Sequence, residues 1–283
     1  MIKIIISPAK KMNVIDEYDC ELTHPVFMEE TRLLHNLLNS MSREELKKLW
    51  QCSDKLTDQN YDRLHSYELE KNLTPALIAY EGIQYQYMAP HIFADSEWNY
   101  VSEHLRILSG FYGILRPTDG VIPYRLEMQA KLRTEGAKDL YQFWGDRLYQ
   151  ELCRQSDGVC ADSGSVDANG KTFAANCLCE DRSMKKEIQI LNLASAEYSK
   201  TILPYIQAPV SCVTCIFGEL VNGKVKMKGT QAKMARGEMV RWMAENQIEK
   251  MEDIRGFNRL NYTYSEEFST ESEYVFLRTD ANC

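Results

Sequence analysis

Short apolar runs without helical spacing alternate with longer amphipathic stretches along this chain, and this alternation restricts the fold more than any other feature. Such runs occur at residues 2–6, 76–80, 105–109, 187–193 and 209–217. Runs of this length predict buried strands, and the helical stretches between them predict a mixed α/β architecture. The pair Asn222-Gly223 predicts a hairpin into a strand at 225–228, so we expect a partly antiparallel sheet surrounded by helices.

Leucine spacing predicts the helices between these runs. After a first leucine-rich helix, Ser42 and Glu45 have the spacing of a capping box that opens a second one. A short connector at 52–57 leads to a third helix, with Thr57 or Asp58 as the expected cap. Two helices joined by so short a turn predict an αα-hairpin. Later helices are expected at 138–153 and 230–246 and from about residue 95, with a last strand near 274–278.

Length and composition are those of an ordinary globular protein. The chain has 283 residues, of which 44% are hydrophobic and 26% charged, which is compatible with one domain over 1–283. No apolar run is long enough for a membrane helix, and the N-terminus lacks the features of a secretory signal. We therefore expect a cytoplasmic protein without membrane partners. The Ser-, Gly- and Asp-rich segment 154–183 predicts an exposed loop insertion.

The distribution of charge matters more than its total. The formal net charge is −8, which does not favour a general attraction to nucleic acid. However, residues 221–245 carry six basic and two acidic side chains, so a polyanion would meet a local basic surface. The nine cysteines are an odd number in a large chain, which fits reduced thiols better than a disulfide framework.

The stretch 109–128 concentrates glycines, prolines and arginines directly after a predicted strand. The glycines permit close backbone approach, and the prolines stiffen the loop that carries Arg116 and Arg125. Rigid loops at strand ends often form sites in α/β proteins, and the planar guanidinium suits phosphate or carboxylate. The alternative is that the two arginines pair with Asp119 and Glu127 and only brace the loop.

Two further basic segments resemble parts of an anion site. Ser-Pro-Ala-Lys at 7–10 follows the first predicted strand, although Lys10 could equally be an ordinary surface lysine. Lys233 and Arg236 lie one helical turn apart, either toward a ligand or on a solvated helix face. Gly237 is costly inside a helix and indicates close approach by a ligand or a neighbouring backbone.

Together these segments resemble a known family, the YaaA family of bacterial cytoplasmic proteins linked to peroxide stress. The resemblance rests on IIISPAKKM at the N-terminus, SDKL (53–56), HLRILSGFYGILRP with PYRLEM (104–128), KDLYQFWGD (138–146), NLASAEY (192–198), AKMARG (232–237) and IRGFN (254–258). It implies a single compact α/β domain with a positively charged cleft and a helix-hairpin-helix element that binds duplex or branched DNA. It also implies a role in limiting oxidative DNA damage, with lowered free iron as a further proposal, and no established reaction or cofactor.

Within the matching motifs, the resemblance implies a set of cleft residues. These are Ser7, Lys10, Lys55, Arg116, Tyr124, Arg125, Lys233 and Arg236. The hairpin around Ser53–Leu56 is the first candidate for the helix-hairpin-helix, since its turn amides and Lys55 could hold a phosphate. The segment 247–257 is the second candidate.

The chain departs from the family pattern in its long 154–183 segment and in four cysteines. Cys177 with Cys179 and Cys212 with Cys215 could supply four thiolates for zinc or an iron–sulfur centre. An odd offset on a strand, however, points Cys212 and Cys215 to opposite faces. We therefore expect no metal site.

Two hypotheses for function follow. The first is a DNA-binding stress protein that recognises shape rather than sequence through phosphate contacts. The second is an enzyme for a small phosphorylated or nucleotide-like substrate, favoured by candidate residues on stiff strand-end loops and by the acidic net charge. The second gains if the candidate side chains share one cavity, and it loses if they scatter.

Overall fold

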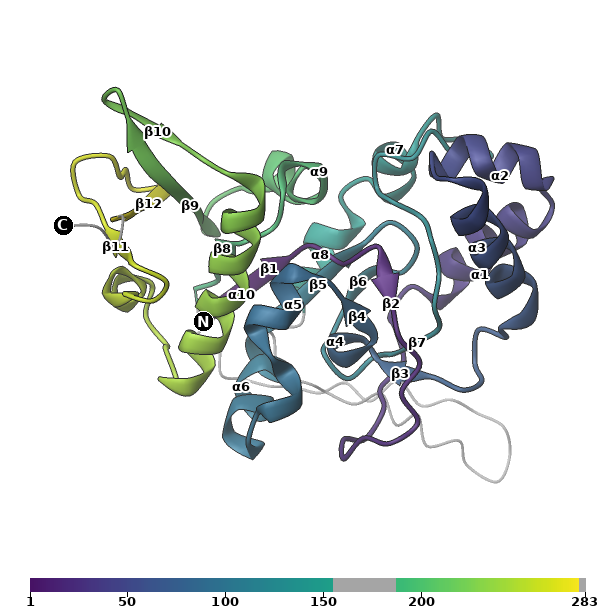
Figure 1. The fold of residues 1–283 in the computed structure, drawn as a ribbon, viewed down its shortest axis with the longest axis horizontal. Coiled ribbons are helices and arrows are strands. Elements are labelled where there is room, and N and C mark those ends of the chain that lie inside the picture. The colour runs from purple at the N-terminus through teal and green to yellow at the C-terminus, as the bar shows by residue number, and fades with distance from the viewer. Residues whose placement is uncertain (155–186, 280–283) are drawn as a thin grey trace, which may run out of the picture.

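The main sheet of this computed structural model, which describes residues 1–154 and 187–279, has eight strands (Figure 1). They are β1 (Ile2–Ile6), β5 (Leu105–Ser109), β6 (Gly113–Leu115), β8 (Gln189–Asn192), β9 (Ser211–Val221), β10 (Lys224–Lys226), β11 (Tyr262–Tyr264) and β12 (Glu273–Arg278). Their order is β11-β12-β9-β8-β1-β5-β6, and β10 pairs with β9. Neighbours from β12 to β5 are parallel, whereas β6, β10 and β11 pair antiparallel with their partners. The predicted mixed α/β fold is confirmed.

Strand β1 lies between β8 and β5, and every one of its residues is buried. Ile4 is in register with Leu105 on one side and with Leu191 on the other. A parallel strand covered on both faces needs a continuous apolar run, and this explains the sequence of β1. Its one polar residue, Lys3, is 1% exposed, and its Nζ donates to the Glu103 carbonyl at 2.9 Å.

Helices surround this sheet. They are α1 (Met28–Asn39), α2 (Arg43–Trp50), α3 (Asp54–Ser66), α4 (Ala76–Ala79), α5 (Ile83–Met88), α6 (Asp95–His104), α7 (Leu140–Trp144), α8 (Arg147–Arg154), α9 (Ala196–Ser199) and α10 (Gly229–Glu245), with 3₁₀ turns at 90–92, 203–205 and 251–256. Helices α10, α5 and α6 pack together, while α1, α2 and α3 form a separate group at the other end of the molecule (Figure 1).

Two short strand pairs lie outside the main sheet. Strand β2 (Lys11–Met12) pairs with β4 (Tyr80–Glu81), and β3 (Thr74–Pro75) pairs with β7 (Gly120–Val121). The first pair connects the loop after β1 to the start of α5. It therefore helps to position the segment that carries Lys10.

The prediction of a strand at 76–80 is wrong. Residues 76–79 form the short helix α4, and only Tyr80 continues into β4. The Ala76 amide donates to the Asp119 carbonyl at 2.8 Å, and the Leu77 amide donates to the Pro117 carbonyl at 3.0 Å. These long-range bonds fix a conformation that the apolar run alone does not reveal.

Two helix predictions are corrected, one in its continuity and one in its capping residue. The single helix expected at 138–153 is split into α7 and α8, because Gly145 adopts a positive φ of 53° between them. The cap of α3 is Ser53, not Thr57 or Asp58, since Thr57 is buried within the helix and its hydroxyl donates to the Ser53 carbonyl. The capping box of Ser42 and Glu45 and the turn at Asn222-Gly223 are present as predicted.

Most of the segment predicted as a loop insertion, 154–183, lies outside the described residues, and so do Cys177 and Cys179; Arg154 ends α8. Among the described residues, no helix is long and apolar enough to span a bilayer.

Candidate functional site

A cavity of about 400 Å³ opens beyond the carboxyl ends of β1 and β8. Strand β1 lies between β8 and β5. The connection that leaves β1 leads toward β5, whereas the connection that leaves β8 leads toward β9 on the opposite side, so the two connections diverge. Such a reversal point opens a crevice in which α/β sheets commonly bind ligands. The topology of the sheet therefore creates the hollow, and the strand-end loops supply its walls.

The cavity gathers most of the residues singled out from the sequence. Its lining includes Ser7, Lys10, Tyr124, Arg125, Lys233 and Arg236, and it does not include Lys55 or Arg116. The six residues come from the loop after β1, from the loop at 124–127 and from α10. The fold thus brings together side chains that are more than 200 residues apart in sequence.

Ser7 joins the two strand-end loops that form the floor of the cavity. Its hydroxyl oxygen accepts the Ser195 amide at 2.8 Å and lies 3.1 Å from the Ser195 hydroxyl. The Tyr85 hydroxyl donates to the Ser7 carbonyl at 3.0 Å. These bonds hold the chain after β1 against the chain after β8, so Ser7 has a structural role at the site.

One carboxylate, that of Glu127, is shared by two of the predicted cations. Its Oε1 lies 3.1 Å from Lys10 Nζ and 3.1 Å from Arg125 Nη2. The Lys10 side chain is 64% exposed, whereas that of Arg125 is 10% exposed. Arg125 therefore pairs with Glu127, as the alternative in the sequence analysis predicted. Both residues also line the cavity.

Glu197 on α9 adds a second carboxyl group to the cavity. Its Oε1 accepts the Gln129 amide at 3.2 Å. Burial raises the pKa of Glu197, and the nearby charge of Glu127 acts in the same direction. A carboxyl group whose pKa is raised can hold or release a proton closer to neutral pH.

Tyr124 belongs to an aromatic wall. Its hydroxyl lies 2.7 Å from the Tyr80 hydroxyl and 2.6 Å from the Ser109 hydroxyl, and its ring stacks on Phe111 with centroids 4.9 Å apart. Burial raises the pKa of Tyr124 to about 12, so the phenol stays protonated at physiological pH. Tyr85 and Tyr198 extend this wall.

Helix α10 also lines the cavity. Lys233 is exposed and Arg236 half-buried, and neither has a carboxylate within ion-pair distance among the described residues. Arg236 Nε is buried without a hydrogen-bond partner in the same part of the chain. Burial lowers the pKa of Arg236, although a guanidinium remains charged at neutral pH. This wall therefore presents uncompensated positive charge.

Arg116 lies outside the cavity and pairs with Asp119, which is the alternative that the sequence analysis left open. Its Nε lies 3.9 Å from Asp119 Oδ1, and its backbone amide donates to Asp119 Oδ2 at 2.8 Å. The buried Asp119 carboxylate also accepts the Thr23 hydroxyl at 2.6 Å. Arg116 thus braces the turn at 116–119.

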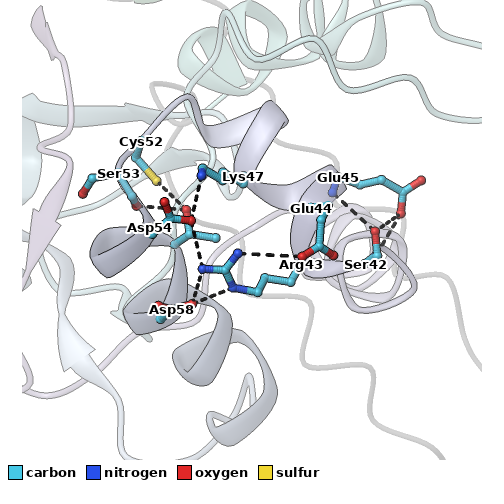
Figure 2. Close-up of polar contacts among 10 residues, drawn as sticks. Ser42, Arg43, Glu44, Glu45, Lys47, Cys52, Ser53, Asp54 and Asp58 are labelled. Atoms are coloured by element: carbon cyan, nitrogen blue, oxygen red, sulfur yellow. Dashed lines mark hydrogen bonds and ion pairs between the residues drawn. The ribbon is translucent and has the colours of Figure 1, made fainter.

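Lys55 lies on α3 of the αα-hairpin that α2 and α3 form, and it does not line the cavity. In Figure 2, Arg43 reaches across from α2 to Asp58 at 2.6 Å and to Asp54 at 3.2 Å, and Lys47 meets Asp54 at 2.7 Å. The basic side chains of α2 that face the turn are therefore paired with carboxylates of α3. Lys55 itself is exposed.

The second candidate hairpin, 247–257, is a 3₁₀ turn at Met251–Gly256 that follows α10 rather than a pair of α-helices. Gln247, at the junction, adopts a positive φ of 49°. The segment also lines no part of the cavity.

The two cysteines that the structure describes within the unusual set lie on β9. Cys215 is buried and Cys212 is half-buried, and burial raises the pKa of both thiols. Within residues 1–154 and 187–279, no group of three or more His, Cys, Asp or Glu side chains could hold a metal ion. The four-thiolate arrangement is untested, because Cys177 and Cys179 lie outside these ranges.

Sequence reasoning missed several cavity residues, notably Gln84, Ser195 and Glu197. Ser195 and Glu197 lie in the segment 192–198, directly after a predicted strand, and that position was a usable signal. The sequence did not indicate Gln84 as a cavity residue. It lies on α5, and the position of α5 depends on the segment 76–80, which was wrongly predicted as a strand.

Fold and cavity together define an α/β protein with a cation-lined cleft at the reversal point of its sheet. Comparison with known proteins then gives the family. The model of the family described as peroxide stress protein YaaA matches residues 2–268, and the chain belongs to that family. A UPF0246 protein of Desulfitobacterium hafniense is 46% identical over 279 residues, covering 99% of each chain. One of Pediococcus pentosaceus is 44% identical over 279 residues, covering 98% of each.

Proposed function

We propose that this member of the peroxide stress family acts by binding a phosphate-bearing ligand in the strand-end cleft. The observation that carries the proposal is the convergence of six predicted residues from distant segments on one cavity. Two of its cations, Lys233 and Arg236, lack a carboxylate partner in the described chain. The charge of the half-buried Arg236 is costly without a counter-ion, and an anionic ligand would compensate it.

The dimensions of the cavity favour a small phosphorylated or nucleotide-like ligand. Its volume of about 400 Å³ lies within the range of roughly 300–1,000 Å³ that is usual for small-molecule sites. Protonated tyrosines could orient such a ligand, and the carboxyl group of Glu197 could exchange a proton with it. An enzymatic role in the same cleft is therefore consistent with the site.

Exposed lysines favour a second candidate function, the binding of duplex or branched DNA by shape rather than sequence. Lys10 and Lys233 are exposed at the cleft, and Lys224 and Lys226 are exposed on the β9–β10 hairpin that projects from the sheet (Figure 1). Phosphate contacts by lysine would position a nucleic acid backbone. Protection of cytoplasmic DNA from oxidative damage, with or without lowered free iron, would then be the role.

Ligand titration tests both candidates. Purified protein is titrated with AMP, a 30-base-pair duplex and a four-way junction at 50 mM and 200 mM salt. The Lys233→Gln/Arg236→Gln double variant should lose binding, because it removes both unpaired cations. Arg241→Gln is the matched control on the same helix, since Arg241 pairs with Glu245 at 2.7 Å and lies outside the cleft.

The outcomes separate the candidates. Binding of AMP that the double variant loses supports the small-ligand site, and steeply salt-dependent DNA binding that it loses supports the second candidate. The proposal fails if the wild-type protein binds none of these ligands, or if the double variant binds them as the wild type does.

A further inference from the structure

The charged side chains of the cleft divide into a paired and an unpaired set. Lys11 meets Glu81 at 2.6 Å, and Lys10 and Arg125 share Glu127. Lys233 and Arg236, the two cations of the α10 wall, have no ion pair in the described parts of the chain. Helix α10 therefore contributes two uncompensated unit charges, and the group of Lys10, Arg125 and Glu127 contributes one more, because a single carboxylate balances only one of its two cations.

A third donor lies beside this wall. Gln84 on α5 is 7% exposed and lines the cleft, and its Nε2 is buried with no hydrogen-bond partner among the described residues. Helix α10 packs closely against α5 at Gly237, next to Arg236, where the Gln84 backbone leaves no room for a side chain. A buried amide without a partner is unusual in a folded protein and costs free energy. It indicates a position where Gln84 Nε2 would donate a hydrogen bond to a ligand oxygen.

Resting on the function proposed above, we infer that Lys233, Arg236 and Gln84 form a subsite for a terminal phosphate monoester rather than for an internal phosphodiester. A phosphate monoester carries nearly two negative charges at pH 7 and three acceptor oxygens. Two unpaired cations match that charge, and an ammonium, a guanidinium and an amide supply the donors. A phosphodiester carries a single charge and would leave one of the two cations uncompensated.

The same chemistry occurs at the phosphate of a mononucleotide and at a 5′-phosphorylated DNA end. A mononucleotide would place its base against the tyrosines that also line the cleft. A DNA end would insert its terminal nucleotide in the same way and leave the duplex outside. The subsite is common to both, and the experiment below distinguishes them.

Calorimetric titrations of the full chain with AMP, adenosine and the 5′-methyl ester of AMP test the subsite. At pH 7.5, AMP should bind roughly 10- to 100-fold more tightly than either control, as expected for charge-assisted hydrogen bonds. At pH 5.5, below the second phosphate pKa of about 6, the advantage over the methyl ester should shrink severalfold.

Variants show which side chains carry the preference. Arg236→Gln, Lys233→Gln and Gln84→Leu should each reduce the ratio of AMP to methyl-ester affinity, whereas Arg241→Gln should leave it unchanged. Arg236→Lys keeps the charge and should retain part of the preference, which separates loss of charge from misfolding. Circular dichroism and thermal unfolding of every variant check that the fold is intact.

Matched oligonucleotides with a 5′-phosphate or a 5′-hydroxyl identify the source of the monoester. A preference for the phosphorylated end supports the subsite with a DNA end as its ligand, and a preference confined to AMP supports it with a mononucleotide. Equal binding of AMP and its methyl ester at pH 7.5 would overturn the inference but leave the phosphate-binding proposal in place. Failure of every phosphorylated probe, diesters included, would overturn both.

Discussion

A side chain on residue 237 would collide with the backbone of residue 84: a Cβ built on Gly237 lies 2.0 Å from the Gln84 carbonyl oxygen. The contact joins α10 to α5 and so places Arg236 beside Gln84 on the cleft. Glycine is required because the obstructing atom is backbone and cannot rotate away. The position of the α10 wall therefore depends on the absence of one methyl group.

We expect Gly237→Ala to destabilise the protein by about 1–3 kcal/mol, the usual cost of overpacking, and to weaken ligand binding in the cleft. Urea unfolding followed by circular dichroism measures the first effect, and AMP titration measures the second. Gly229→Ala in the same helix is the control, because nothing lies within 4 Å of its added Cβ. Equal stability of the two variants would contradict the close packing.

Tyr124→Phe should cost about 1–3 kcal/mol of stability, because it removes a hydroxyl bonded to both Tyr80 and Ser109 and leaves two buried hydroxyls short of a partner. Urea unfolding of the variant checks this value. Tyr61→Phe is the control, since no hydrogen bond joins the Tyr61 hydroxyl to another described residue. If both variants lose the same small amount, the network does not stabilise the wall.

Stability should rise with pH above about pH 8 because of Lys3. Burial lowers the pKa of Lys3 from 10.5 to about 8, and the charge of Arg106 acts in the same direction. Between these values the unfolded chain binds more protons than the folded one, so deprotonation favours folding by up to about 1.4 kcal/mol per pH unit. Urea unfolding at pH 7, 8, 9 and 10 should show this rise in the wild type and lose it in Lys3→Met. An unchanged slope in the variant would exclude Lys3 as its source.

Lys55→Gln should leave AMP affinity unchanged within about twofold, because Lys55 lies on the α2–α3 hairpin and lines no part of the cleft. The same variant tests the hairpin as a DNA contact. If the hairpin holds a phosphate, the salt dependence of duplex binding should fall by about one unit of slope. A loss of AMP binding would show that hairpin and cleft are coupled.

The secondary structure was predictable where the local sequence pattern of a segment matches its surroundings in the folded protein. The apolar runs at 2–6 and 105–109 are strands because both lie inside the main sheet, and Asn222-Gly223 is a turn because both residues adopt positive φ. The run at 76–80 has a similar composition but becomes α4, since its amides bond to carbonyls of residues 117 and 119. Partners that distant leave no trace in the local sequence.

The candidate site was predictable in part for a comparable reason. Residues just beyond strand ends, such as Ser7 and Arg125, could be selected because topology brings such ends together. Arg116 and Lys55 share the same chemistry, but their positions relative to the cleft depend on the path of the chain between elements. The sequence also offered no sign of Gln84. This residue stands out only because its Nε2 is buried without a hydrogen-bond partner among the described residues.

The central place of β1 has a consequence for synthesis on the ribosome. Strand β1 pairs with β5, about a hundred residues later in the chain, and with β8, which begins at Gln189. The apolar segment Ile2–Ile6 has neither neighbour until residue 109 has been made and only one until residue 192, so the nascent chain must keep it from aggregating in the meantime. The cleft and the sheet are completed later still, because the cleft needs Arg236 of α10 and the sheet needs β12, which ends at Arg278.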